Sequence, residues 1–309
     1  MNAAVVQSFS TPPSYTTFVD PIPGEGEKLV HVTAAGLHQI VRGLASGSHY
    51  GSGGELPFVP GVDGVGRLED GTRIYFGLSR APFGTFAEQA LATSRIMVPL
   101  PDGLDDATAA GIANPAMSSW VALRQRISFG RGQRVLVIGA TGNAGRMAVQ
   151  IAKGLGAAQV IGAGRDQARL SELKALGADE TCTLDKLAIA AEVDVVLDYV
   201  WGPPAARAMA DMLTAREDRS RQLTWIEIGS QGGLEAPIPS AALRSARLDI
   251  VGSGVGSVPG RDFVEEIPQL AAAVAKGAVD VRARAVPLSR VEQAWADAAH
   301  TTDRIVLVP

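Results

Sequence analysis

A glycine-rich turn is the strongest chemical signal in the sequence. The apolar run 135–138 leads into Gly139, Ala140, Thr141, Gly142, Asn143, Ala144 and Gly145. Gly139 and Gly142 permit a tight turn with close backbone approach, and Gly145 permits a helix to pack closely on a strand. The N–H groups at the start of that helix would face an anion, and the helix dipole adds to the attraction.

This turn predicts a pyrophosphate site. Its G-x-x-G-x-x-G spacing departs from the usual dinucleotide fingerprint, and a glycine turn can also simply join a strand to a helix. Its position after the first strand of a βαβ series favours a bound dinucleotide.

The end of the second strand in that series indicates which dinucleotide. An NAD site usually has a carboxylate there, but the sequence has Ala163, Gly164 and Arg165. Arg165 and Arg169 are four residues apart and fall on the same side of a helix start, where two guanidinium groups could hold a 2′-phosphate. This favours NADPH over NADH. In the alternative interpretation both arginines are solvated, and Asp166 is a helix N-cap or a ribose ligand.

The elements that must position these residues follow two patterns. Up to about residue 114 the sequence indicates short strands, at 2–6, 28–35, 62–68 and 72–76, separated by turns dense in Gly and Pro. After residue 133, apolar runs alternate with helical stretches, which predicts strands at 134–139, 159–162, 193–199, 223–229 and 248–251. That alternation is typical of βαβ units with right-handed crossovers onto a parallel sheet.

Helical spacing supports this interpretation. In the stretch 144–155, Met147, Ile151 and Leu155 recur every four residues and predict one buried helix face. From Arg261 onward we expect a helix ending near residue 276, a strand at 279–286, a helix at 289–299 and a closing strand at 304–308. The charged segment 214–222 is interpreted as a solvated loop, with a partner contact as the alternative.

Length and composition limit the class of protein. A chain of 309 residues predicts two domains. The single cysteine, Cys182, excludes an internal disulfide and a four-thiolate zinc site, and favours the reducing cytoplasm. The net charge is −4 without a long Lys/Arg run, so no nucleic-acid partner is expected. The uncharged runs 2–19 and 107–123 are interrupted by polar residues, Pro or Gly, so neither a signal peptide nor a membrane span is expected.

Further motifs carry a family resemblance. Residues 56–66 resemble a Pro-Gly turn before a Gly-rich strand, and residues 84–88 resemble a G-[TS]-[FY]-A-E signature. These precede a crossover helix at 113–123, the glycine turn, the Leu-Gly-Ala-Asp segment 176–179 and the terminal strand. In this order, nearly the whole chain resembles the medium-chain dehydrogenase/reductase superfamily, in its zinc-free, zeta-crystallin-like quinone oxidoreductase branch.

The resemblance implies an α/β protein of two domains. A GroES-like, β-rich catalytic domain would comprise residues 1–115 and 257–309. A Rossmann domain, with a doubly wound parallel sheet for NADP, would comprise residues 116–256. The active site would lie in the cleft between them. The family also implies a homodimer paired through Rossmann sheet edges, with which the hydrophobic edge at 248–254 is compatible.

The resemblance also bears on metal binding. Zinc-dependent relatives have a Cys ligand after an early strand and a His ligand in a G-H-E motif. The corresponding segments here, 36–39 and 61–64, contain no thiolate, and Val62 replaces the second ligand. His31, His38, His49 and Asp63 match no familiar ligand spacing, so we expect no functional metal.

Family positions suggest further cofactor contacts. They place His38 near the nicotinamide and Ser118 on the crossover helix. Two pairs follow parallel strands, where the cofactor crevice would lie: Gly229 with Ser230, and Gly252 with Ser253. For each pair, a simple turn is the alternative.

The proton donor is assigned by the same resemblance. An ungapped count puts His49 where relatives often have Tyr, and Tyr50 follows it. His49 could act as a general acid, and Tyr50 could donate a hydrogen bond to a developing oxyanion. In the alternative, both are surface residues of a glycine-rich rim and solvent supplies the proton. Val41 and Ala45 replace an Asp and an Arg that are common in the family.

Together these features predict a function. Without a Lewis acid, alcohol oxidation lacks an obvious means of stabilising the alkoxide, whereas reduction of an electrophilic acceptor needs mainly positioning and a proton. We therefore expect an NADPH-dependent, zinc-independent reductase of small-molecule quinones or α,β-unsaturated carbonyls. The alternatives are an NADPH-binding redox sensor or interaction protein with little turnover, and a zinc alcohol dehydrogenase.

Overall fold

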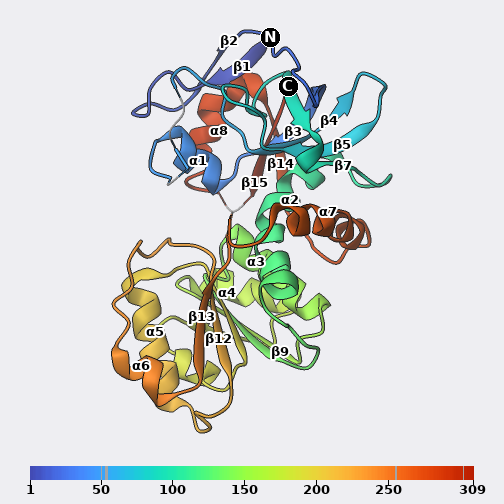
Figure 1. Ribbon diagram of the computed structural model, residues 1–309. Helices are drawn as coiled ribbons and strands as arrows, with labels where there is room; N and C mark the ends of the chain where they lie inside the picture. The colour runs from blue at the N-terminus through green and yellow to red at the C-terminus, as the bar shows by residue number, and fades with distance from the viewer. Residues whose placement is uncertain (50, 53–54, 255, 302) are drawn as a thin grey trace. The chain divides into compact units, whose positions relative to one another are not determined.

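The structure is a computed structural model that describes residues 1–49, 51–52, 55–254, 256–301 and 303–309. The chain forms two compact units, whose helices and strands are labelled in Figure 1. The first unit contains Met1–Pro115, Ile267–Lys276 and Val281–Pro309, and the second contains Ala116–Glu266 and Gly277–Asp280. This is an α/β architecture with one β-rich unit and one parallel-sheet unit, as expected from the sequence. Residues 257–266 and 277–280 lie in the second unit, whereas the resemblance assigns them to the first.

The first unit is built on a seven-stranded sheet with the order β14-β15-β3-β4-β5-β7, in which β6 pairs with β3. A separate antiparallel pair, β1-β2, lies outside that sheet. The strands are β1 (Asn2–Val5), β2 (Ser14–Thr17), β3 (Glu27–Gly36), β4 (Asp63–Leu68), β5 (Arg73–Gly77), β6 (Gln89–Thr93), β7 (Met97–Pro99), β14 (Ala283–Pro287) and β15 (Arg304–Val308). The helical elements wholly within this unit are α1 (Gln39–Ala45), η1 (Ser94–Ile96), η5 (Leu288–Arg290) and α8 (Val291–Asp297).

Alternation along β3 explains how this sheet covers a core. Val30, Val32 and Ala34 are buried, whereas His31 between them is exposed. Side chains of successive strand residues point to opposite faces, so one face of β3 packs inward. Phe76 of β5 is fully buried in the same core.

The second unit is a six-stranded parallel sheet with the order β10-β9-β8-β11-β12-β13. Its strands are β8 (Arg134–Ile138), β9 (Gln159–Gly164), β10 (Glu180–Thr183), β11 (Val195–Asp198), β12 (Leu223–Glu227) and β13 (Leu248–Gly252). The chain moves outward from β8 through β9 to β10, then continues from β11 on the other side of β8. The strand order therefore reverses between β8 and β11, the switch point at which open α/β sheets bind ligands.

Helices join these strands. They are α3 (Asn143–Gly154), α4 (Gln167–Glu172), η3 (Leu173–Leu176), η4 (Leu187–Ala190), α5 (Gly202–Ala215) and α6 (Ser240–Ser245). Two more, α2 (Asp106–Val121) and α7 (Gly260–Ala275), have residues in both units, and α2 continues as a π-helical turn, η2 (Ala122–Arg126). On α3, Met147 and Ile151 are buried as the four-residue spacing predicts, and Leu155 is the half-buried C-cap.

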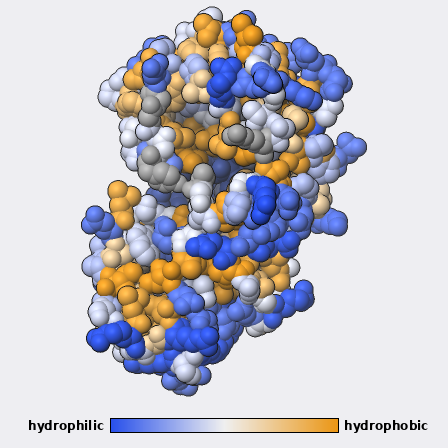
Figure 2. Space-filling model, viewed as in Figure 1, coloured by the Kyte–Doolittle hydropathy of each residue, from blue (hydrophilic) through white to orange (hydrophobic). Residues whose placement is uncertain are grey.

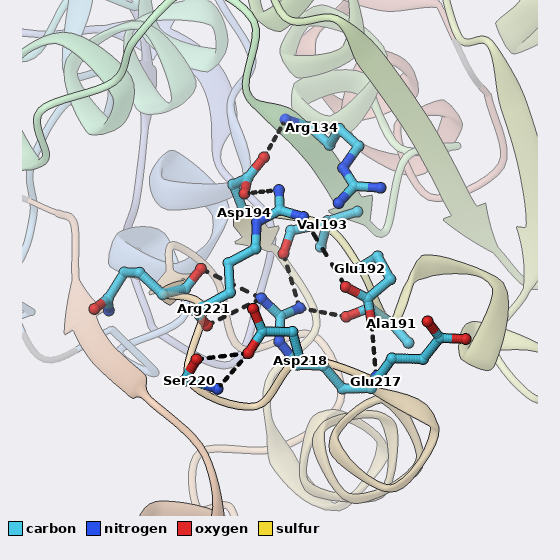
Figure 3. A network of polar contacts seen from close by, with 11 residues as sticks. Arg134, Ala191, Glu192, Val193, Asp194, Glu217, Asp218, Ser220 and Arg221 are labelled. Atoms are coloured by element: carbon cyan, nitrogen blue, oxygen red, sulfur yellow. Dashed lines mark hydrogen bonds and ion pairs between the residues drawn. The ribbon is translucent and has the colours of Figure 1, made fainter.

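Arg216 ties the charged segment 214–222 to the second unit. Its buried guanidinium donates to four backbone carbonyls, those of Ala191, Val193, Arg221 and Gln222. Figure 3 shows the neighbouring Arg221 directed at Asp194, whose carboxylate also accepts the Arg134 N–H at 2.7 Å. The interpretation of this segment as a solvated loop is therefore wrong for Arg216. A run of charged residues in the sequence does not indicate which of its arginines is buried against backbone carbonyls.

Strand β13 forms one edge of the parallel sheet. Leu248, Ile250 and Val251 on this strand are half-buried. Figure 2 shows apolar residues gathered over the part of the second unit where Figure 1 labels β12 and β13. An edge strand with apolar side chains is a surface that favours pairing with another strand.

Candidate functional site

The glycine turn after β8 adopts a conformation that side chains would disrupt. Gly139 has a φ of +84°, in the left-handed region that favours glycine. A Cβ on Gly145 would lie 2.2 Å from the Gly139 carbonyl oxygen and 2.7 Å from the Ala140 Cα. The N–H groups of Gly139 and Ala140 both donate to the Ala163 carbonyl at 2.9 Å, which attaches the turn to the end of β9. The turn therefore has no side chain at its tightest points, and its hydrogen bonds to Ala163 fix its conformation.

The start of α3 offers hydrogen-bond donors at this turn. Gly142 is the N-cap and provides no side-chain cap, and the Arg146 N–H makes the first bond of the helix, to the Gly142 carbonyl at 2.9 Å. The first N–H groups of an α-helix have no partner inside the helix, and they lie at the positive end of its dipole. In α3 these belong to Asn143, Ala144 and Gly145. A glycine turn that leads to N–H groups without a side-chain cap fits the pyrophosphate of a dinucleotide.

The end of β9 lies beside this turn. A Cβ on Gly164 would come within 2.9 Å of the Thr141 Cγ2. Arg165 and Arg169 are both exposed, and Arg169 lies 3.4 Å from Asp166 (Nε to Oδ2). Asp166 accepts the N–H groups of Ala168 and Arg169, so it is the N-cap of α4. The 2′-phosphate role of the two arginines stays a prediction.

Ser118, predicted from its family position, hydrogen-bonds with a residue that sequence reasoning missed. Its Oγ lies 3.0 Å from the hydroxyl of Tyr199, the residue directly after β11. The C-terminal part of α2 is held by buried Glu266, which accepts from Trp120 at 2.6 Å and from Arg124 at 2.7 Å. Tyr199 ends the predicted strand 193–199, and a polar residue at the carboxyl end of a central strand was the signal that could have identified it.

The two predicted Gly-Ser pairs lie at different distances from the switch point. Gly229 follows β12, next to β11, and its N–H donates to the Asp198 carbonyl at 3.2 Å. Ser230 is exposed. Gly252 ends the outer strand β13, and buried Ser253 donates its N–H to Glu227 at 2.8 Å. The structure thus brings Gly229 beside the strand at the switch point and leaves Gly252 and Ser253 at the sheet edge.

In the first unit, His38 belongs to a buried polar cluster. The ring is 1% exposed, and its Nε2 lies 2.8 Å from Asp63 Oδ1, at an angle outside the hydrogen-bond range. The Arg304 guanidinium contacts the other ring nitrogen, Nδ1. Tyr75 donates its hydroxyl to Asp63 Oδ2 at 2.6 Å. We refer to His38, Asp63, Tyr75 and Arg304 as the buried quartet.

The chemistry of the partners determines how protons are distributed in the quartet. A guanidinium only donates, so His38 Nδ1 accepts, and the proton of the neutral ring is on Nε2, facing Asp63. Burial raises the pKa of Asp63 to about 7, although the Tyr75 hydrogen bond opposes the shift. Burial also lowers the pKa of Arg304 to about 10. The predicted place of His38 near a nicotinamide stays a prediction.

A zinc ion does not fit these donors. The cationic Arg304 guanidinium lies against His38 Nδ1, and His38 Nε2, which faces the Asp63 carboxylate at 2.8 Å, carries the proton of the neutral ring. Within the described ranges, no three His, Cys, Asp or Glu side chains come together as a group that could hold a metal ion. Leu37 and Val62, in the segments corresponding to the zinc ligands of relatives, supply no donor atom.

The predicted proton donors are only partly described. His49 is half-buried, and its Nδ1 accepts the Gly51 N–H at 3.0 Å. Tyr50 lies outside the described residues. With Nδ1 accepting, the proton of a neutral His49 ring is on Nε2. The catalytic role of both residues stays a prediction.

Among the described residues, no helix combines the length and apolar character needed to cross a lipid bilayer.

Comparisons with known proteins agree with this architecture. Residues 144–276 match a family described as zinc-binding dehydrogenase. A probable NADPH-dependent quinone reductase of Emericella nidulans is 31% identical, with 100% of both chains covered. A quinone oxidoreductase of Pongo abelii is 27% identical over 93% of this chain and 91% of its own.

Solved structures are similar over the whole chain. The quinone oxidoreductase of Thermus thermophilus, whose structures include a complex with NADPH, has a TM-score of 0.85 at 25% identity, with 100% of both chains covered. A probable oxidoreductase of Mycobacterium abscessus has a TM-score of 0.83 at 27% identity, over 100% of this chain and 99% of its own.

Proposed function

Since the chain belongs to the medium-chain dehydrogenase/reductase superfamily, in its quinone oxidoreductase branch, we propose that it is an NADPH-dependent, zinc-independent reductase of quinones or α,β-unsaturated carbonyls. The observation that carries this proposal is the glycine turn at Gly139–Gly145, where uncapped N–H groups begin α3 beside the switch point of the sheet. This geometry suits a pyrophosphate.

Hydride transfer explains why a metal is not needed. When bound, NADPH supplies a hydride to a conjugated acceptor, whose negative charge spreads onto oxygen. The chain must then hold the two reactants together and deliver a proton. The donor set of the buried quartet does not suit zinc, so no step is assigned to a metal.

We assign the role of proton donor to the loop that contains His49. Because its Nδ1 accepts from Gly51, its Nε2 is the atom that can give a proton to the reduced acceptor. Tyr50 is the second proposed donor. Solvent would be the better candidate if His49→Ala and Tyr50→Phe each left turnover unchanged.

Cofactor choice is assigned to Arg165 and Arg169. Arg165 makes no ion pair within the described part of the chain, and Arg169 pairs only with the exposed Asp166. Exposed guanidinium groups beside the turn can reorient toward a 2′-phosphate without breaking a buried contact. The remaining cofactor contacts are assigned to His38, Ser118, Gly164 and the two Gly-Ser pairs.

We further propose a cytoplasmic homodimer that pairs through β13. The edge position of this strand and its half-buried Leu248, Ile250 and Val251 support strand pairing between two copies. The single buried thiol, Cys182, suits a reducing compartment. The molar mass in solution, measured by light scattering, tests the dimer.

A second candidate is an NADPH-binding redox sensor. Val41 and Ala45, where relatives often have Asp and Arg, are buried in the core of the first unit, so this segment offers an acceptor fewer polar groups. The test is NADPH oxidation by chelator-treated protein with a panel of quinones and enones, with NADH in parallel. Turnover that prefers NADPH supports the reductase. NADPH binding without consumption of any acceptor supports the sensor.

A further inference from the structure

Tyr199 lies among residues that the proposed function assigns to the cofactor. It directly follows β11, on one side of the switch point. A Cβ on Gly139 would lie 3.2 Å from the Tyr199 Cβ, and a Cβ on Gly229 would lie 3.2 Å from the Tyr199 carbonyl oxygen. The Tyr199 hydroxyl lies 3.0 Å from Ser118 Oγ. Tyr199 therefore lies beside two proposed cofactor residues, Gly139 and Gly229, and hydrogen-bonds with a third, Ser118.

The loop that presents Tyr199 is held in one conformation. Buried Asp198 accepts the N–H groups of Val200 at 2.8 Å and Trp201 at 2.9 Å on Oδ1, and the Trp225 indole at 2.9 Å on Oδ2. Trp201 has a φ of 51°, a left-handed conformation that costs free energy in a residue other than glycine. A strained backbone persists when its surroundings determine it, and such strain concentrates at functional sites.

The Tyr199 hydroxyl is suited to donate a hydrogen bond. Burial raises the pKa of this phenol to about 12, against the opposing effect of hydrogen bonds with Ser118 and Ser119, so it keeps its proton at neutral pH. Ser118 can donate to the phenolic oxygen. In that arrangement the Tyr199 proton is available to Ser119, whose own proton goes to the Ala116 carbonyl, or to a ligand that approaches the hydroxyl.

The strand order indicates which part of the cofactor lies there. The 2′-phosphate arginines follow β9 and the pyrophosphate turn follows β8. Because the order continues from β8 to β11 and β12, the nicotinamide half would lie over the ends of those two strands. Tyr199 and Gly229 occupy these ends.

We propose that Tyr199 is a cofactor-contacting residue whose hydroxyl, paired with Ser118, donates a hydrogen bond to the nicotinamide half of the bound dinucleotide. This inference rests on the proposed function. It adds a chain-specific contact that orients the reactive ring, separate from the contacts that hold the adenosine half.

The test compares two ligands. Adenosine 2′,5′-bisphosphate contains the adenosine half with its 2′-phosphate but lacks the nicotinamide half. We expect Tyr199→Phe to weaken NADPH binding about tenfold, because one hydrogen bond is lost, and to change binding of the bisphosphate by less than about twofold. Dissociation constants come from calorimetric titration. Tyr15→Phe, which alters a tyrosine on β2 in the first unit, is the matched control and should change neither constant.

Unchanged NADPH affinity in Tyr199→Phe would overturn the inference while leaving the proposed function in place. Equal weakening of both ligands would also overturn it, since that result means that the hydroxyl only supports the loop. Failure of the unmodified protein to bind NADPH would overturn the proposed function and this inference together.

A double-mutant cycle adds a second measurement. In a Ser118→Ala background, we expect Tyr199→Phe to weaken NADPH binding by clearly less than tenfold, because the two hydroxyls act as a pair. Additive effects would contradict the paired arrangement. The melting temperature of each variant, measured without ligand, separates loss of folding from loss of binding.

Discussion

His38 Nε2 lies 2.8 Å from Asp63 Oδ1 in the interior of the first unit, and the opposite ring nitrogen of His38 contacts Arg304. The imidazole thus separates a buried carboxylate from a buried guanidinium. Three segments distant in sequence, the start of α1, β4 and β15, meet at this ring. A buried charge is tolerated when such partners compensate for the water it has lost.

The first prediction concerns pH. Burial raises the pKa of Asp63 from 3.8 to about 7 in the folded protein. Since the folded pKa exceeds the unfolded one, this stabilising contribution is complete below pH 3.8 and is lost as the pH rises through about 7. Each unit of pKa difference corresponds to about 1.4 kcal/mol of unfolding free energy. The wild-type melting temperature should therefore fall between pH 5 and pH 8. Because asparagine does not titrate, we expect Asp63→Asn to lower the melting temperature less at pH 8 than at pH 5, so that the pH dependence of stability becomes flatter.

The control for this prediction is Asp70→Asn. Hydrogen bonds from Thr72 lower the pKa of exposed Asp70, so its stabilising contribution is lost only as the pH falls below 3.8, and Asp70→Asn should leave the slope between pH 5 and pH 8 unchanged. Melting temperatures measured from pH 5 to pH 8 check both variants. A wild-type profile that keeps its slope in Asp63→Asn would contradict a raised pKa for Asp63.

The second prediction concerns the glycine turn after β8. We expect Gly145→Ala to destabilise the protein by about 1–3 kcal/mol and to weaken NADPH binding, because the new Cβ would overlap the Gly139 carbonyl oxygen. Gly154→Ala, at the other end of α3, has open space around its Cβ and should be neutral or more stable by about 0.5–1 kcal/mol. Thermal unfolding with a parallel NADPH titration measures both. Similar behaviour of the two variants would show that the turn tolerates a side chain.

The third prediction concerns cofactor choice. We expect Arg165→Asp to weaken NADPH binding about ten- to a hundredfold, because a charge-assisted hydrogen bond is replaced by repulsion, and to weaken NADH binding much less. Dissociation constants for both nucleotides check this. Arg207→Asp, which changes an exposed arginine of α5 in the same way, should affect neither nucleotide. Equal losses for NADPH and NADH in Arg165→Asp would remove the 2′-phosphate assignment.

The fourth prediction concerns Arg216. Replacing it by Met leaves the four backbone carbonyls shown around it without their donor, and each buried unsatisfied polar group costs about 1–3 kcal/mol. We expect Arg216→Met to lower the urea midpoint of the second unit, followed by tryptophan fluorescence, since Trp225 lies in its core. Arg219→Met removes an exposed arginine from the same segment and should leave the midpoint nearly unchanged. Equal effects would mean that the buried contacts contribute little.

Local patterns in the sequence were sufficient to predict much of the second unit. The apolar runs match β8, β9, β11, β12 and β13, and the closing strand 304–308 is β15. The turn at Gly139 could be predicted because the glycine spacing and the start of the helix involve residues that are neighbours in sequence. Strand and helix periodicities are short-range properties, so they need no knowledge of the sheet order.

Tertiary structure alone decided which side chains meet. His38 and Arg304 are 266 positions apart, and Ser118 and Tyr199 are 81 apart. Arg216 is buried although its neighbours in sequence are charged. Such contacts depend on the order of the strands in the sheet and on which side chains surround each buried position. Neither property produces a repeating pattern in the sequence. The sequence by itself therefore determined most strands of the second unit and the glycine turn, whereas strands β2, β6, β7 and β10 were not predicted, and the three-dimensional packing determined the buried quartet and the place of Tyr199.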